Sequence, residues 1–289
     1  MRSPELSSDE DLPLVSIVTA VRNGSRYLSA LIESVLAQDY PRIEHIVIDD
    51  GSDDDGATIR ILEQYPHLRW WSRENEGQYA TQNEGLAAAT GSIVSVICAD
   101  DCYVTPSGVS LAVDYLLEHP EYGCVFGRTL YIGEDGDLFE AQTRIHGRLA
   151  LFLLKYESTI AHCALFVRAD DLVEAGAMFD PWYRFCGDWE WLLRLRRNGV
   201  AFGHISEPVA LFRVHDKQTS QNMDERRLHE EAQRIFTIYG DYALARRFVG
   251  LFLDVRNLVL RAAVSLRRGG PRALWADVRE WARRRFIGH

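Results

Sequence analysis

Short apolar runs alternate with amphipathic stretches along the first hundred residues of this 289-residue chain. Runs rich in β-branched residues predict buried strands, which we place at 14–21, 44–48, 67–72 and 92–98. Between them, apolar positions recur at helical spacing and predict helices, which we place at 27–36, 58–64 and 79–89. Strands that alternate with helices are typical of crossover units. We therefore expect an α/β fold with a Rossmann-like, mostly parallel sheet flanked by helices.

The pattern loses this regular alternation after about residue 105. Its elements are predicted as a mixture of helices near 111–119 and 189–197 and strands near 122–130, 161–167 and 209–214. We expect one domain over 13–225, with halves at 13–105 and 106–225. A flexible acidic tail is expected over 1–12, and a C-terminal helical segment over 226–289.

The charge of the chain is unevenly distributed. The formal net charge is −10, yet residues 246–289 carry eleven arginines against three acidic residues. The strongly acidic remainder argues against nucleic acid as a partner. The basic segment also contains two apolar stripes at helical spacing. It is compatible with peripheral contact with an anionic membrane surface, with a homodimer interface, or with packing on the domain itself.

The sequence also bears on the cellular compartment. It contains no apolar run of about 18 residues and no apolar signal segment after Met1. The five cysteines form no zinc-type CxxC pair, which favours free thiols in a reducing compartment. We expect a cytoplasmic protein; if the basic segment contacts lipid, it would place the protein at the inner face of the membrane.

Two pairs of adjacent aspartates close apolar runs of the sequence. Asp49 and Asp50 follow the second predicted strand, and Asp100 and Asp101 follow the fourth. Ligands of open α/β sheets bind outside the carboxyl ends of the strands. Divalent metal ions are commonly held there by carboxylates together with substrate phosphates. The aspartates alternatively cap solvated turns, but their repeated position at strand ends favours a site for a metal and a diphosphate.

Five segments resemble, in order, the family 2 inverting nucleotide-sugar glycosyltransferases, which have the A-type nucleotide-binding fold. The first begins Val15-Ser-Ile-Val, the second contains Ile48-Asp-Asp-Gly-Ser, and the third runs from Glu74 to Gly91 before the aspartate pair. The fourth is Gly187-Asp-Trp-Glu-Trp, similar to the segment of the catalytic base. The last, Phe212-Arg-Val-His-Asp-Lys-Gln-Thr-Ser, resembles the late Arg-x-His-x-x-Gln-x-Ser segment of the family.

The resemblance implies transfer of a sugar from a nucleoside-diphosphate sugar to a hydroxyl acceptor, with Mn²⁺ or Mg²⁺ as cofactor. The acceptor would be a glycan, a glycolipid or a polysaccharide precursor of the cell envelope. It assigns Asp101 to the metal, His215 to the metal or the diphosphate, and Asp50 to the nucleobase. The residues assigned to the nucleotide are Ala20, Arg22, Asn23, Asp50, Gly77, Asn83 and Asp100, the last at the ribose or the metal.

Two departures from the family pattern bear on these assignments. The first turn reads Ala20-Val-Arg-Asn, where the family usually has Pro-Thr-Tyr-Asn. Arg22 therefore replaces a tyrosine that stacks on the base, which leaves the nucleobase preference open. Cys98 or Ala99 stands where the family often has an aspartate before the metal carboxylates.

The resemblance implies that Asp188 is the catalytic base, and a single carboxylate can take the proton that the acceptor hydroxyl loses. One base and direct attack imply inversion at the anomeric carbon. Asp188 alternatively caps the helix that follows it, and Glu190 is the nearest rival base. Aromatic residues that suit either sugar stacking or a core flank the segment, namely Trp182, Tyr183, Trp189 and Trp191.

Other function classes remain as alternatives. A sugar-phosphate nucleotidylyltransferase shares the nucleotide fold and the metal aspartates, but it needs a Gly-rich basic loop after the first strand, and residues 21–25 do not form one. A non-catalytic nucleotide-sugar-binding module would be expected to lack the segment of Asp188. No GxGxxG motif follows the first strand, which disfavours a dinucleotide oxidoreductase.

Overall fold

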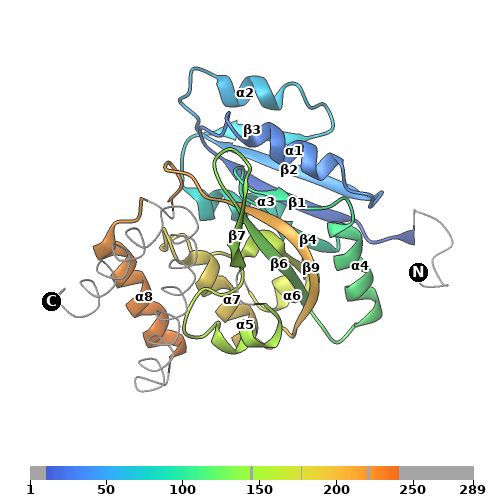
Figure 1. Ribbon diagram of the computed structural model, residues 1–289, viewed down its shortest axis with the longest axis vertical. Helices are drawn as coiled ribbons and strands as arrows, with labels where there is room; N and C mark the ends of the chain where they lie inside the picture. Colours follow the sequence, from blue (N-terminus) through green and yellow to red (C-terminus); the bar gives the residue numbers. More distant parts are fainter. Residues whose placement is uncertain (1–10, 144–145, 177, 220–221, 241–289) are drawn as a thin grey trace.

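The computed structural model describes residues 11–143, 146–176, 178–219 and 222–240. Within these ranges, helices flank a nine-stranded sheet (Figure 1). The basic segment over 246–289, with its two apolar stripes, lies outside the described residues, as does most of the acidic tail.

The first half of the chain forms the regular part of the sheet. Its four strands pair in parallel in the order β3–β2–β1–β4. They are β1 (Val15–Val21), β2 (Ile43–Asp50), β3 (Arg69–Arg73) and β4 (Ile93–Val96). The connecting helices are α1 (Leu28–Leu36), α2 (Ala57–Leu62) and α3 (Gln78–Ala88). This arrangement confirms the expected Rossmann-like α/β fold.

The part of the chain after β4 completes the sheet with both strand directions. The strands are β5 (Cys102–Tyr103), β6 (Cys124–Ile132), β7 (Leu138–Thr143), β8 (Leu165–Arg168) and β9 (Phe202–Arg213). β8 is antiparallel to β4 and β6, whereas β9 is parallel to β6 and antiparallel to β5. The helical elements are α4 (Gly108–Glu118), α5 (Gly147–Leu153), the 3₁₀ turn η2 (His162–Ala164), α6 (Ala169–Glu174), α7 (Gly187–Arg197) and α8 (Glu225–Tyr239).

Strand β9 is much longer than the 209–214 range that the sequence predicts. It begins at Phe202, and its pairing with β6 changes register where Arg128 faces Pro208. Proline has no N–H to donate to a neighbouring strand and is usually found at edges or bulges. The irregularity at Pro208 interrupts the apolar alternation, which is why the pattern predicts only the last part of this strand.

Helices cover both faces of the sheet. Successive side chains of a strand point to opposite faces, so neighbouring residues of β1 enter different layers. Ile17 is buried in a core cluster with residues of α1 and α4. Val18 is buried in a second cluster with residues of α3, α7 and α8, which includes Trp191 and Ile235. Helices α3, α7 and α8 therefore share one layer, and the cores join the two predicted halves of the domain.

Candidate active site

Three side chains at the carboxyl end of β4 lie close enough to share one cation. The Sγ atom of Cys98 and carboxylate oxygens of Asp100 and Asp101 lie within 4.8 Å of one another. Asp101 is buried, and its Oδ1 accepts the backbone N–H of Arg213 at 3.0 Å. Asp100 is partly exposed, and its Oδ2 lies 3.0 Å from Nε2 of His215. His215 thus meets Asp100, while Asp101 anchors the end of β9.

Arg213 organises the turn that carries the two aspartates. Its Nε donates to the carbonyl oxygen of Asp100 at 3.0 Å. Its guanidinium lies over the ring of Tyr27, 4.6 Å from the centroid, and the same ring lies 4.9 Å from the ring of His215. The antiparallel pairing of β5 with β9, in which Cys102 faces Leu211, brings these residues together. Sequence reasoning included Arg213 in a motif but gave it no role.

Asp50 lies at the carboxyl end of β2 and holds the loop before α3. Its Oδ1 accepts from Arg73 and from the backbone N–H of Glu76, both at 2.9 Å, and its Oδ2 accepts the N–H of Gly77 at 3.0 Å. Gly77 has a φ of 95°, a conformation that favours glycine. A carboxylate offers about four acceptor positions, so these three bonds leave room for one further donor.

The turn that follows β1 packs against the turn that follows β2. Asn23, with a φ of 53°, exchanges two hydrogen bonds with Asp53, at 2.6 and 2.9 Å. The exposed Arg22 side chain lies 3.6 Å from the same carboxylate. The hydrogen bond from Asn23, with the charge of Arg22, lowers the pKa of Asp53. Ala20 is the penultimate residue of β1 and lies beside this turn in sequence.

Asn83 has a structural task in this arrangement. Its amide nitrogen donates to the carbonyl of Phe179 at 2.8 Å, and its amide oxygen accepts the N–H of Phe179 at 2.7 Å. Both ends of the side chain therefore tie α3 to the segment that precedes α7. The predicted contact of Asn83 with the nucleotide stays a prediction.

Asp188 lies in the first turn of α7, two residues after Cys186, which precedes the helix. Its side chain is 20% exposed, and its Oδ2 lies 3.4 Å from Nδ1 of His162. A helix amino terminus favours a negative charge, so this position suits an ionised carboxylate. The rival Glu190 is buried, pairs with Arg194 at 2.9 Å and accepts the hydroxyl of Tyr239 at 2.6 Å. Glu190 is thus held in the packing between helices.

His162 links the predicted base to the aspartate turn. Its Nε2 lies 3.3 Å from Sγ of Cys98, while its Nδ1 faces Asp188. Burial raises the pKa of the Cys98 thiol well above its usual range, and the nearby Asp101 and Asp100 raise it further. The thiol is therefore neutral at pH 7. Sequence reasoning missed His162, because it is an isolated histidine in an apolar stretch.

Tyr79 of α3 lies beneath the start of α7. Its hydroxyl oxygen accepts the backbone N–H groups of Gly187 at 3.0 Å and Asp188 at 3.3 Å. Burial raises the pKa of Tyr79 well above its usual value, and the charge of Asp188 adds to this effect. A neutral tyrosine hydroxyl thus supports the turn that presents Asp188. The sequence placed Tyr79 in a family-like segment without identifying this contact.

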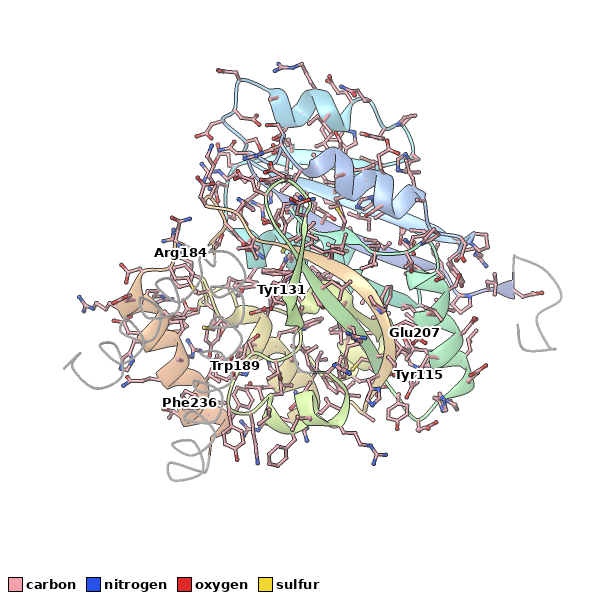
Figure 2. The ribbon with its side chains drawn as sticks, in the orientation of Figure 1. Tyr115, Tyr131, Arg184, Trp189, Glu207 and Phe236 are labelled. Atoms are coloured by element: carbon pink, nitrogen blue, oxygen red, sulfur yellow. The ribbon has the colours of Figure 1, made fainter. Side chains whose placement is uncertain are left out.

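The aromatic residues around Asp188 divide into core and surface. Tyr183, Trp189 and Trp191 are buried, whereas Trp182 is 40% exposed. Figure 2 shows Trp189 and Phe236 on neighbouring helices, and their ring centroids lie 5.5 Å apart. Trp182 alone of the four has an accessible ring, and the guanidinium of Arg227 lies 4.0 Å from its centroid.

Among the described residues, no helix has the length and the apolar character needed to span a bilayer.

The sheet order and the strand-end carboxylates define a glycosyltransferase-like α/β protein. The chain belongs to glycosyl transferase family 2, whose family model matches residues 16–176. It is 31% identical over 216 residues to an uncharacterized glycosyltransferase of Rickettsia typhi, covering 72% of this chain and 66% of that protein. An uncharacterized glycosyltransferase of Rickettsia conorii is 39% identical over 220 residues, covering 73% of this chain and 35% of that protein. The chain thus spans less than two thirds of these relatives.

Solved structures share the fold at low sequence identity. Staphylococcus aureus TarS (residues 1–349) in complex with UDP-GlcNAc superposes with a TM-score of 0.64 and 15% identity, covering 93% of this chain and 81% of that chain. The mannosyltransferase PcManGT from Pyrobaculum calidifontis, in complex with GDP-Man and Mn²⁺, gives a TM-score of 0.58 and 18% identity, with 95% and 82% coverage. These likenesses confirm the A-type glycosyltransferase fold.

Proposed function

We propose that this protein is an inverting glycosyltransferase that moves a sugar from a nucleoside-diphosphate sugar to a hydroxyl of a glycan, glycolipid or polysaccharide precursor. Membership of family 2 supports a glycosyltransferase. The proposed roles of the base and of the metal are supported by the contacts that run from Asp188 through His162 to Cys98, which lies beside Asp100 and Asp101. A candidate base and candidate metal ligands thus belong to one site.

The side chains at the end of β4 fit a divalent ion. Asp100 and Asp101 would supply carboxylate oxygens, and His215 an imidazole nitrogen. This donor set suits Mn²⁺, and the carboxylates without the imidazole would suit Mg²⁺. When bound, the ion would stabilise the negative charge that grows on the departing diphosphate. Asp100 and His215 are in contact with each other, so we propose that both face the ion together with Asp101, whose Oδ1 also holds the end of β9 through the N–H of Arg213.

In the proposed reaction, the acceptor oxygen attacks the anomeric carbon as the bond from that carbon to the diphosphate breaks. The electron pair of the broken bond leaves with the nucleoside diphosphate, and the acceptor proton passes to Asp188. A single displacement of this kind inverts the configuration of the anomeric carbon. Asp188 is partly exposed, as a group that meets the acceptor must be.

The proposed nucleotide site lies along the ends of β1, β2 and β4. The Asp50 carboxylate has one acceptor position beyond its three bonds, which suits the imide N–H of a nucleobase. We propose that Arg22, Asn23 and Gly77 border the nucleotide. Asp100 would then lie between the ribose and the metal.

The test is a screen of nucleoside-diphosphate sugars with Mn²⁺, with Mg²⁺ and with excess chelator, in which released nucleoside diphosphate is measured. Metal-dependent release from one donor, increased by a hydroxyl acceptor, is the expected result. Binding of donors without any turnover would identify a non-catalytic module. Release of pyrophosphate from a nucleoside triphosphate and a sugar phosphate would instead identify a nucleotidylyltransferase.

We also propose that the protein acts in the cytoplasm, with residues 246–289 as a peripheral contact with the inner face of the membrane or as a homodimer interface. The support is the excess of arginine over acidic residues and the two apolar stripes in this segment. A lipid-linked acceptor would make a membrane contact useful.

A further inference from the structure

Glu231 of α8 is a fully buried carboxylate whose oxygens are completely engaged. Its Oε1 accepts the backbone N–H of Arg184 at 2.8 Å and Nε of Arg227 at 2.9 Å. Its Oε2 accepts the backbone N–H groups of Phe185 and Cys186, both at 2.9 Å. Burying a charge is costly unless it is paired and hydrogen-bonded. Four donors, one of them cationic, fill the four acceptor positions of this carboxylate.

The three backbone amides bound by Glu231 lie immediately before the first turn of α7. The next two amides, those of Gly187 and Asp188, donate to the hydroxyl of Tyr79. Five consecutive N–H groups are therefore held by only two side chains, one from α8 and one from α3. The first N–H groups of a helix have no partner within the helix. Glu231 and Tyr79 therefore hold the amides that lead into α7, and Oδ1 of Asp188 itself accepts the next one, from Trp189, at 2.8 Å.

Helix α8 also holds the rest of the segment that leads into α7. Arg234 pairs with Asp180 at 3.1 Å, and Arg227 donates to the carbonyl of Trp182. At the other end, Tyr239 donates to Glu190 within α7. Figure 1 shows α8 alongside α7, and Figure 2 shows Arg184 at the upper end of α8. The contacts extend along the whole segment from 180 to 190.

We propose that Glu231 is a positioning residue that fixes the orientation of Asp188 for proton transfer. The proposal rests on the proposed role of Asp188 as the base. Glu231 does not touch the reacting groups; it acts through the amides of 184–186 and the first turn of α7. Glu231 and Asp188 both lie beyond the residues 16–176 that the family model matches.

The substitution Glu231→Gln tests the proposal, because a glutamine amide keeps the shape but replaces one acceptor oxygen with a donor group that faces backbone N–H groups. Displacement of a reacting group by about 1 Å costs on the order of 10²-fold in rate. We expect kcat for transfer to fall about 10- to 100-fold, with the KM for the donor nearly unchanged. The matched control is Glu230→Gln, which removes the same charge from a side chain that is 47% exposed, and it should keep the parent kcat.

A double-mutant cycle distinguishes positioning from a general loss of stability. If Glu231 acts through Asp188, Glu231→Gln should have little further effect on the residual transfer rate of Asp188→Asn. An equal fold-loss in both backgrounds, or a parent kcat in Glu231→Gln, would overturn the proposal. If the glutamine variant does not fold, Glu231→Asp keeps the charge on a shorter side chain. Its kcat should be reduced at unchanged donor KM, and a parent kcat there would equally count against the proposal.

Hydrogen exchange separates this inference from the proposed function. The amides of residues 184–186 should be protected in the full chain, exchange faster in Glu231→Gln and remain protected in Glu230→Gln. If the parent transfers no sugar from any donor, the proposed function fails while this exchange pattern still stands. If the three amides exchange equally fast in the parent and in Glu231→Gln, Glu231 does not stabilise the start of α7 and the inference fails.

Discussion

Nδ1 of His162 lies 3.4 Å from Oδ2 of Asp188, while the other ring nitrogen of this histidine lies 3.3 Å from the thiol sulfur of Cys98. The two contacts connect elements that are far apart in the chain, because Cys98 follows β4 and Asp188 begins α7. The imidazole thereby limits how the carboxylate can turn. His162 therefore contacts the side chain of Asp188, and the hydroxyl of Tyr79 accepts its backbone N–H.

Asp188→Asn is expected to retain binding of the nucleotide sugar and to lose transfer. An amide has the shape of the carboxylate but cannot accept the acceptor proton, and loss of a general base typically costs about 10²–10⁴-fold in rate. Donor binding by calorimetry and transfer rates would be measured on the same preparation. Transfer at the parent rate would remove Asp188 from the mechanism.

His162→Phe is expected to lower kcat about tenfold at unchanged donor KM, a smaller effect than loss of the base itself. Phenylalanine fills the space of the ring but offers no nitrogen to Asp188 or Cys98. His229→Phe, at an exposed position of α8, is the control. A donor KM that rises in His162→Phe while kcat stays constant would assign His162 to donor binding instead.

Asp100→Ala and Asp101→Ala should both weaken Mn²⁺ binding, but they should differ in stability. Asp101 is buried and accepts the N–H of Arg213, so its removal leaves a buried donor unsatisfied and costs about 1–3 kcal/mol of unfolding free energy. Asp100 is partly exposed, and its loss should cost less. Metal titrations and denaturant unfolding separate the two effects. Full turnover of the parent in excess chelator would contradict a metal role for both.

The stability of the protein should decrease between about pH 6.5 and pH 3 in part because of His45. This side chain is buried beside Thr19, and burial, with a smaller effect of His67, lowers the pKa of His45 to about 3. In that pH window the unfolded chain binds a proton that the folded chain does not. The free energy of unfolding therefore falls with falling pH, by up to about 1.4 kcal/mol per pH unit.

The measurement for His45 is denaturant unfolding from pH 7 to pH 4, compared with His45→Gln, which cannot take up the proton. The variant should show a shallower fall with decreasing pH, whatever its stability at pH 7. His229→Gln, on the surface of α8, should keep the parent slope. Equal slopes for the parent and His45→Gln would show that other groups dominate in this pH range.

Removal of residues 246–289 is expected to change location or assembly more than the chemistry of the site. The segment contains the arginine excess but none of the five family-like segments, and a basic residue near an anionic membrane contributes about 1 kcal/mol. Co-sedimentation with anionic vesicles and light scattering would be compared for the full and truncated chains. Loss of vesicle binding supports membrane contact, and loss of a dimer supports an interface. An unfolded truncated chain would show that the segment belongs to the core.

The sequence predicts best those features that depend on local periodicity. The aspartates at the ends of β2 and β4 lie at one edge of the sheet, as expected, because parallel strands end on the same side of a sheet. The roles of His162 and Glu231 could not be predicted from the sequence. His162 contacts Asp188, and Glu231 binds the amides of 184–186, and both contacts join segments that are distant in the chain and share no sequence pattern. The choice between Asp188 and Glu190 likewise needed tertiary contacts, because both carboxylates lie in the first turn of one amphipathic helix.

The contacts that complete the aspartate turn also have a consequence for folding. His215 and Asp100 are 115 residues apart in sequence, and Arg213 and Asp101 are 112 apart. The turn gains these partners only when the last strand of the sheet has docked, which requires a long loop of the chain to close. A cation that binds only the closed arrangement would stabilise it by mass action. Substitutions that loosen β9 far from any ligand, for example at Gly203 where it packs against Tyr115, would then weaken cation affinity.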